Sequence, residues 1–475
     1  MLKSAMPSSC RALVPEVLPA VMPDLPAVPE FLPAPPPELV LPSRLPADLP
    51  AEGRAVLAAA LAGRLPAGKR PGQGELVRES VPCRWDDEEI TRLRGFLRTV
   101  DDLRGRQGRV YPLEFLLALP LLAGMAGDRE LDAAAEWTAT APGELLARLG
   151  APAGRDGKPR RPDAGTIRRG LIGCDQGQYD DALCAWSAAR ARALRPGLRK
   201  HLRIDGKALR GAARGGRAPM LLSGIWDDGT TAAQLPAGVK KTNKIPVFRD
   251  LLAKIPAGDL AGAVISADQM HTQRRHARAI AAAGAFYIFT IGDNQPRLFD
   301  AADALPWRSV AGEAWTVDRG HGRTDVRTIK TLPATPEIKA LFPDVEQVFL
   351  AERYSYGTDG ELLGAVAVLG ITSLPAGQAG QAGPADLLAY LRGHWAIEVH
   401  HYVRDVVLGE DASRTAAAHR AMAAVRNTVT GVLHLHQVPN IAAQLRACHR
   451  DPYRLPLLLL GLMTPLAPNG NHAVT

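Results

Sequence analysis

The chain has 475 residues, which is enough for two to four domains at roughly 100–200 residues each. Hydrophobic residues make up 46% of it and charged residues 22%, so a chain that is disordered throughout is excluded. The formal net charge of +8 is a mild excess for this length, so the places where basic residues gather matter more than their number.

The five cysteines are scattered through the chain without a CxxC pair. A disulfide framework or a cysteine zinc site is therefore not expected, and a reducing cytoplasm suits the chain best. The two most apolar stretches, residues 113–127 and 455–463, fall short of the roughly 20 residues that a membrane-spanning helix needs. The N-terminus lacks the continuous apolar run of a signal peptide, so we expect a soluble, cytoplasmic protein with no membrane partner.

Residues 1–80 are predicted to form a Pro/Ala-rich leader that is largely disordered. Thirteen of the 39 prolines lie in the first 50 residues, and proline removes amide donors and fixes φ. A partner-binding arm and a wrongly set start codon are alternative interpretations of this composition.

Residues 81–198 are predicted to form a helical, DNA-binding N-terminal domain. Acidic residues from Asp86 onward open its first helix. Further helices are predicted at residues 112–127, 130–137, 142–149, 164–172 and 178–195. A basic loop at 153–161 leads into a helix that carries Arg168 and Arg169 near its start, which is typical of a segment that contacts the DNA backbone. A solvated basic loop that caps a helical bundle would explain the pattern equally well.

Residues 199–303 change to strand patterns and are predicted to form the first part of an α/β core. The expected elements are strands at 199–205, 220–228 and 230–239, a helix at 243–255, a strand at 262–268, a helix at 271–284 and a strand at 285–293. This order predicts a hairpin meander followed by crossover units, and hence a mixed sheet covered by helices.

The remaining chain is predicted to add an insertion and then return to helices. Residues 304–384 hold short strand patterns such as AWTVDRG and QVFLAERYSY, so we expect a β-rich insertion there. Residues 385–440 supply the last core helices, one from Ala385 through about Val407 and one at 415–436. Residues 441–475 are expected to form a C-terminal tail.

Two carboxylates stand at the ends of predicted strands in basic surroundings. Asp205 is the one acid in the window 190–217, which holds ten Lys or Arg residues. Asp268 ends the strand VISAD and precedes a helix that carries Arg274. Cations attract a polyanion such as nucleic acid, and a carboxylate among them can hold a divalent metal against it. Surface ion pairs would also explain Asp205, and a helix N-cap would explain Asp268.

A third carboxylate, Glu398, lies on the helix predicted from Ala385. His394, Glu398 and Asp405 share one face of that helix. A helix carboxylate brought against two strand-end carboxylates can hold two Mg²⁺ ions about 3.5–4 Å apart, an arrangement that suits phosphodiester displacement. His394, Glu398 and His401 could instead be zinc ligands of a hydrolase, although this alternative leaves the two aspartates unexplained.

Several motifs carry a resemblance to a known family. They include IDGKALRGA at 204–212, ISADQMHTQ at 265–273, DRGHGRTDVRTI at 318–329 and RGHWAIEVHHYVRDVVLGEDASR at 392–414. In this order, and over about residues 83–436, the chain resembles insertion-sequence DDE transposases of the H-repeat-associated type, the ISAs-type family.

The resemblance implies an RNase-H-like catalytic core with the β-rich insertion before its last catalytic helix. It implies that Asp205, Asp268 and Glu398 form a catalytic triad that holds two Mg²⁺ ions, for which Mn²⁺ can substitute. The implied substrates are the terminal inverted repeats of the element and target DNA, which the enzyme cuts and joins. A homodimer in the synaptic complex and a place in the bacterial cytoplasm, associated with the nucleoid, follow from the same resemblance.

Further residues are expected to contact the DNA. The expected phosphate ligands, besides the two arginines of the N-terminal domain, are Lys207, Arg210, Arg274, Arg323 and Arg327. Trp395 is a candidate for stacking on a splayed base, and helix packing is the favoured alternative. The chain departs from the family's usual residues at Gly292-Asp293, at Lys244 and at Arg203. A non-catalytic, DNA-binding remnant of a transposase is therefore kept as an alternative function.

Overall fold

The computed structural model describes residues 87–194, 200–238, 244–320, 322–377, 382–414 and 417–450. These residues divide into two compact units. We call residues 260–394 the sheet unit, and residues 87–259 with 395–450 the helical unit, each with the gaps just given. The predicted leader and the last residues of the predicted tail lie outside the described residues.

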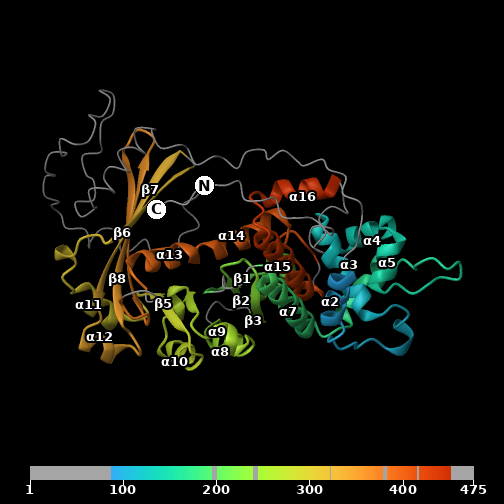
Figure 1. The fold of residues 1–475 in the computed structure, drawn as a ribbon, viewed down its shortest axis with the longest axis horizontal. Helices are drawn as coiled ribbons and strands as arrows, with labels where there is room; N and C mark the ends of the chain where they lie inside the picture. Colours follow the sequence, from blue (N-terminus) through green and yellow to red (C-terminus); the bar gives the residue numbers. More distant parts are fainter. Residues whose placement is uncertain are drawn as a thin grey trace. The chain divides into compact units, whose positions relative to one another are not determined.

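The helical unit begins with a bundle in which the predicted helices are confirmed (Figure 1). Its helices are α2 (Asp87–Leu97), α3 (Leu113–Met125), α4 (Leu131–Thr140), α5 (Gly143–Leu149), α6 (Ala164–Ile172) and α7 (Gln176–Leu194). Helix α3 is apolar on all sides and almost completely buried, because α2, α4, α6 and the later helix α15 (His419–Leu435) surround it. Helix α7 runs beside α15 and joins the bundle to the strands that follow.

The predicted meander is also confirmed in the helical unit. Strands β1 (His201–Ala208), β2 (Met220–Trp226) and β3 (Thr231–Pro236) pair antiparallel in chain order. Helix α8 (Lys244–Ala253) packs on β2 and β3, and α7 packs on β3. A short helix, α9 (Ala257–Leu260), follows α8 at the boundary between the units.

The sheet unit contains a mixed sheet. Strand β4 (Val264–Ala267) runs parallel to β5 (Phe286–Thr290), and helix α10 (Arg274–Ala282) connects them. The predicted insertion supplies long antiparallel strands, which join the sheet in the order β5-β9-β8-β7-β6. They are β6 (Ala314–Gly320), β7 (Arg323–Pro333), β8 (Gln347–Gly357) and β9 (Leu362–Thr372).

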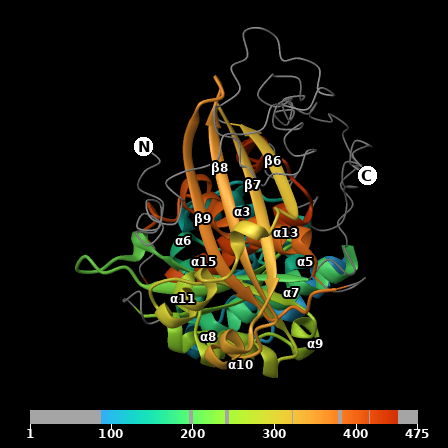
Figure 2. The ribbon, with the colours of Figure 1, turned by 90° about the vertical axis from the view of Figure 1, so that its left-hand side faces the viewer.

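Strands β6 to β9 stand side by side in Figure 2, and helix α13 (Pro384–His394) packs along β4, β6 and β7. Helices α11 (Pro296–Asp303) and α12 (Pro336–Leu341) lie against each other. The sequence analysis does not identify either of these short helices, and each begins with a proline in its first turn.

The last helices differ from the prediction in two places. The single helix expected from Ala385 to about Val407 ends at His394, and a second helix, α14 (Ala396–Tyr402), continues into a π-helical turn, η7 (Val403–Val407). Where a tail is expected, residues 441–450 form helix α16 (Ile441–Arg450). Its buried residues Ile441, Leu445 and Cys448 recur at helical spacing, a pattern that was available in the sequence. No helix of the described residues is long and apolar enough to cross a membrane.

Candidate catalytic carboxylates and an ion cluster

Asp205 lies within strand β1 and not at its end. Gly206, Lys207 and Ala208 continue the pairing with β2, so the expectation that the strand ends at Asp205 is wrong. The side chain of Asp205 is partly buried and accepts a hydrogen bond from the backbone N–H of Gly206 at 2.5 Å. Its Oδ2 lies 3.7 Å from Nδ1 of His401 on α14.

Asp268 directly follows β4, as predicted. It precedes a short 3₁₀ turn, η5 (Gln269–His271), and its side chain makes no capping hydrogen bond there, which removes support for the N-cap interpretation. Oδ1 of Asp268 lies 4.0 Å from Nε2 of His394, the last residue of α13. Nδ1 of the same histidine lies 2.8 Å from Oγ of Ser266 on β4, which orients the ring toward the aspartate.

Glu398 lies on α14 with an exposed side chain. Helix α14 packs on β1, so Glu398 and Asp205 belong to neighbouring elements of the helical unit, whereas Asp268 belongs to the sheet unit. Among the described residues, no group of three or more His, Cys, Asp or Glu side chains is arranged so that it could hold a metal ion. This holds for the three carboxylates and for the alternative zinc ligands alike. Carboxylate oxygens are nevertheless the donors that Mg²⁺ prefers, so the chemistry of the donor set fits that ion.

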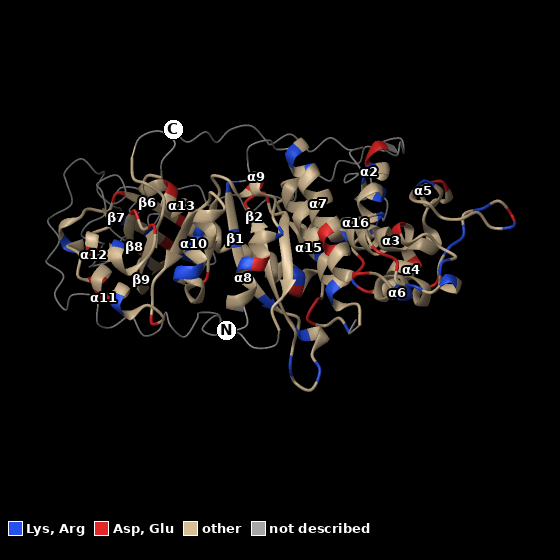
Figure 3. Cartoon of the chain, turned by 90° about the horizontal axis from the view of Figure 1, so that it is seen from below, with Lys and Arg blue, Asp and Glu red and all other residues tan. Residues whose placement is uncertain are grey.

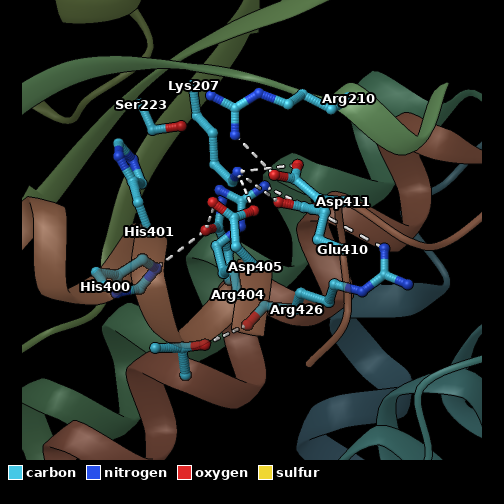
Figure 4. Close-up of polar contacts among 12 residues, drawn as sticks. Lys207, Arg210, Ser223, His400, His401, Arg404, Asp405, Glu410, Asp411 and Arg426 are labelled. Carbon is cyan, nitrogen blue, oxygen red and sulfur yellow. Dashed lines mark hydrogen bonds and ion pairs between the residues drawn. The ribbon is translucent and has the colours of Figure 1, made fainter. Parts of the chain in front are cut away.

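Lys207, two residues after Asp205 on β1, belongs to a cluster of charged side chains that no local pattern in the sequence indicates (Figure 4). We call it the ion cluster, and its members are Lys207, Arg210, Arg404, Asp405, Glu410, Asp411 and Arg426. Only 5% of the Lys207 side chain is exposed, and its ammonium group donates to Oδ1 of Asp405. Oε2 of Glu410 and Oδ1 of Asp411 lie 3.6 and 3.7 Å from the same nitrogen.

Arginines of the ion cluster donate hydrogen bonds to two of these carboxylates. Arg210 donates to Asp411 at 2.8 Å, and the fully buried Arg404 donates to Glu410 at 2.7 Å. Burial raises the pKa of Asp405, and the hydrogen bond from Lys207 opposes this rise. Burial acts in the same direction on Asp411, but the hydrogen bond from Arg210 and the charge of Lys207 outweigh it, so the pKa of Asp411 is lowered.

A buried network of hydrogen bonds connects the ion cluster to α15 and β3, within the helical unit. Arg404 donates to Oδ1 of Asn427 at 2.8 Å, and His400 Nε2 lies 3.0 Å from the same oxygen. Asn427 in turn donates to Oε1 of Gln234 on β3 at 2.7 Å. Burial, together with the positive charge of Arg404, lowers the pKa of His400 to about 3, so this imidazole is neutral at physiological pH.

The ion cluster corrects one expectation for DNA contact. Lys207 is expected to bind a phosphate, but its ammonium group is buried among carboxylates of its own chain. Arg210 keeps 71% of its side chain exposed while it pairs with Asp411. A phosphate could therefore reach Arg210, but not Lys207 in this arrangement.

The other predicted DNA contacts lie at the surface. Figure 3 shows basic residues, in blue, at α6 and along the loop that leads into it. Arg168 lies 3.3 Å from Asp132 in an exposed ion pair, and Arg169 donates to the hydroxyl of Thr166 at 2.8 Å. The side chain of Asp163 caps α6 by accepting from the Thr166 N–H at 2.7 Å.

In the sheet unit, Arg274 is exposed at the first position of α10. Arg323 and Arg327 both pair with Asp325, each at 3.4 Å, and Arg327 also donates to Asp318 at 2.5 Å. In the helical unit, Trp395 is 49% exposed at the start of α14. This exposure favours an external role for Trp395 over burial in a helix core.

Comparisons with known proteins give the family of the chain. Residues 95–187, from the end of α2 through most of α7, match the family model described as DDE_Tnp_1-associated. An uncharacterized protein in the dhlA 3′ region of Xanthobacter autotrophicus is 30% identical over 236 residues, which cover 48% of this chain and 76% of that protein. The chain belongs to a DDE transposase family.

Among solved structures, the chain is similar to piggyBac transposase in a synaptic complex with hairpin DNA. The TM-score is 0.35 and the sequence identity 12%, with 82% of this chain and 85% of that chain covered.

Proposed function

We propose that the protein is a DNA transposase that binds the terminal inverted repeats of its insertion sequence and catalyses Mg²⁺-dependent strand cleavage and strand transfer. Family membership supports the class of reaction. The observation that carries the assignment of the site is the packing of α14, which bears Glu398, on β1, which bears Asp205. The antiparallel meander and the parallel β4–β5 pair support an RNase-H-like core.

In this proposal Asp205, Asp268 and Glu398 hold two Mg²⁺ ions, for which Mn²⁺ can substitute. Bound Mg²⁺ would make an attacking water or 3′-hydroxyl more acidic and stabilise the leaving oxygen. His401 and His394, next to the two aspartates, would keep these carboxylates in place.

The DNA would be bound by arginines, of which Arg327 is only partly exposed, and by one aromatic residue. The proposed contacts are Arg168, Arg169, Arg210, Arg274, Arg323, Arg327 and Trp395. We leave out Lys207, because its ammonium group is paired inside the chain. A homodimer in the synaptic complex, in the cytoplasm of a bacterium, belongs to the same proposal.

Calorimetric titration of Mn²⁺ tests the site without knowledge of the element's ends. We expect Asp205→Asn, Asp268→Asn and Glu398→Gln each to weaken Mn²⁺ binding in the presence of DNA and to abolish cleavage, while DNA binding survives. Asp181→Asn and Glu144→Gln, which alter exposed acids in ion pairs elsewhere, are the matched controls. Near-normal cleavage by any of the three site variants would remove that residue from the triad.

The same experiments separate the alternative functions. A non-catalytic remnant would bind DNA but show no metal-dependent cleavage with either Mg²⁺ or Mn²⁺. A zinc hydrolase would retain stoichiometric zinc, lose it on His394→Ala and be unaffected by Asp205→Asn.

A further inference from the structure

We propose that Lys207 is a positioning residue: the ion cluster around its ammonium group fixes the helix that carries Glu398 on the strand that carries Asp205. This inference rests on the proposed function, because it assigns Lys207 a role in arranging the metal-binding carboxylates. It concerns residues of the helical unit alone.

Two side-chain contacts between β1 and the helix that carries Glu398 have matching spacings. Asp205 and Lys207 are two residues apart on β1 and therefore point to the same face of the strand. Their partners His401 and Asp405 are four residues apart on α14 and η7. Two strand residues span about 6.6 Å, and four residues at the α-helical rise span about 6 Å, so both contacts can form between β1 and this stretch of α14 and η7. Glu398 lies one turn before His401 on this helix.

Three carboxylates lie around the ammonium nitrogen of Lys207. An ammonium group has three donors and no acceptor. Asp405, Glu410 and Asp411 surround that of Lys207, and these acids come from η7 and the loop that follows it. Without the ammonium group, the partly buried carboxylates of Asp405 and Asp411 and the buried carboxylate of Glu410 would lie close together, and Asp405 would lose the cation that it pairs with. Arg210 and Arg404 would remain on the outer sides of Asp411 and Glu410 only. The mutual repulsion of the carboxylates would then push η7 and its loop away from β1.

A close backbone contact lies beyond β1. The strand leads into a 3₁₀ turn, η3 (Arg210–Ala212), which lies directly against the loop that supplies two of the acids. A Cβ at Gly211 would lie 2.3 Å from the carbonyl oxygen of Ser413 and 2.6 Å from that of Glu410. Glycine is therefore required for this close approach. The ion cluster is thus held on both sides, by Lys207 within the strand and by the turn after it.

Buried hydrogen bonds link the ion cluster to the core. Arg404 lies within the π-helical turn and is fully buried, yet it reaches Glu410 in the loop and Asn427 on α15. The backbone N–H of Glu410 also donates to the carbonyl of Arg404 at 2.9 Å. Because π-helical turns often occur at functional sites, a set of buried bonds that holds one in place next to Glu398 suits a positioning role.

The test compares Lys207→Met with the double variant Lys207→Met/Asp405→Asn. The single variant leaves the partly buried carboxylate of Asp405 without its cation, whereas the double variant neutralises both partners and should recover much of the thermal stability. We expect Mn²⁺ binding in the presence of DNA to weaken about tenfold or more in both variants, because outer partners of metal ligands typically change affinity by this amount. Lys254→Met, which removes a lysine from the exposed pair with Asp181, is the control and should bind Mn²⁺ normally.

Hydrogen exchange supplies a readout that is independent of metal. Amides of residues 396–407 should exchange faster in both Lys207 variants than in the wild type, while amides of α3 stay protected. If Mn²⁺ affinity recovers together with stability in the double variant, or if exchange in 396–407 is unchanged, Lys207 has only a structural role and the inference is wrong. If the wild-type protein binds no Mn²⁺, the proposed function fails, and the exchange measurement alone decides whether Lys207 fixes the helix.

Discussion

Asp180, on α7, shows how strongly burial controls single residues in this protein. The residue is 1% exposed, and burial raises the pKa of its carboxyl from 3.8 to about 7. Between these two pH values the folded protein binds more protons than the unfolded chain at this position. Asp180 therefore stabilises the fold less and less as the pH rises through that window.

We expect Asp180→Asn to raise the melting temperature at pH 8 and to leave it nearly unchanged at pH 4. The amide has the shape of the protonated carboxyl and cannot ionise, so the cost of a buried charge disappears at high pH. Thermal unfolding of both proteins from pH 4 to pH 8 provides the measurement. A variant that is less stable at pH 8 would contradict this prediction.

His400 has the opposite effect on the pH dependence. Its folded pKa of about 3 lies below the ordinary value of 6.5, so the unfolded chain binds more protons between these values. The stability contributed by neutral His400 is therefore complete above about pH 6.5 and is lost as the pH falls. We expect His400→Gln to lose less stability than the wild type on acidification from pH 7 to pH 4, as measured by urea unfolding at fixed temperature. Parallel pH profiles for the two proteins would argue against a buried, neutral His400.

The contacts of single residues were the features that could not be predicted from the sequence. The expected triad could be stated from local strings, but Lys207 could be placed only by the structure. Its partner Asp405 is 198 residues away along the chain. No local pattern indicates that a lysine after Asp205 is buried, because lysine is usually exposed unless it has a charged partner.

At the scale of elements, a substitution at Gly211 tests how closely η3 packs against the loop at 410–413. We expect Gly211→Ala to lower the free energy of unfolding by about 1–3 kcal/mol or more, the range typical of overpacking. The new methyl group would meet backbone carbonyl oxygens, which cannot move aside as a flexible side chain could. Chemical denaturation measures the loss.

Gly95, exposed in the interior of α2, is the matched control of opposite sign. A Cβ there meets no atom within 4 Å. Alanine should therefore stabilise the helix by up to about 1 kcal/mol, because it removes the conformational entropy cost of glycine. If both alanine variants lose stability to the same extent, the tight contact at Gly211 is not the cause.

Elements with strong periodicity could be predicted from sequence. Helix α6 and strand β6 have the bounds expected, at 164–172 and in AWTVDRG. The errors lie where tertiary contacts decide the outcome. Strand β1 continues through Gly206 because β2 offers paired partners as far as Met220. The helix break after His394 and the π-helical turn at Val403–Val407 could not be predicted from the secondary-structure propensities of their residues.

At the scale of the whole molecule, proposed DNA binding should depend on salt, because exposed arginines such as Arg168 and Arg169 would neutralise phosphates and release counterions. We expect Arg168→Gln/Arg169→Gln to weaken binding to any duplex and to reduce the slope of log affinity against log salt concentration by about 1–2. Arg148→Gln, which removes an exposed pair with Glu144, should leave the slope unchanged. An unaltered slope in the double variant would exclude α6 from the DNA contact.

The π-helical turn at Val403–Val407 has a consequence for the direction of Glu398. The backbone N–H of Leu408 donates to the carbonyl of Val403 at 2.9 Å, a bond that closes over five residues instead of four. Each residue of an α-helix rotates the chain by about 100°. Deleting one residue from this turn would restore ordinary α-helical bonding. Helix α14, which precedes the turn, would then be rotated about its axis by about 100° relative to the residues that follow the turn. The direction in which Glu398 points therefore depends on the number of residues in the turn that follows it. A one-residue deletion in that turn would redirect this carboxylate without changing its chemistry.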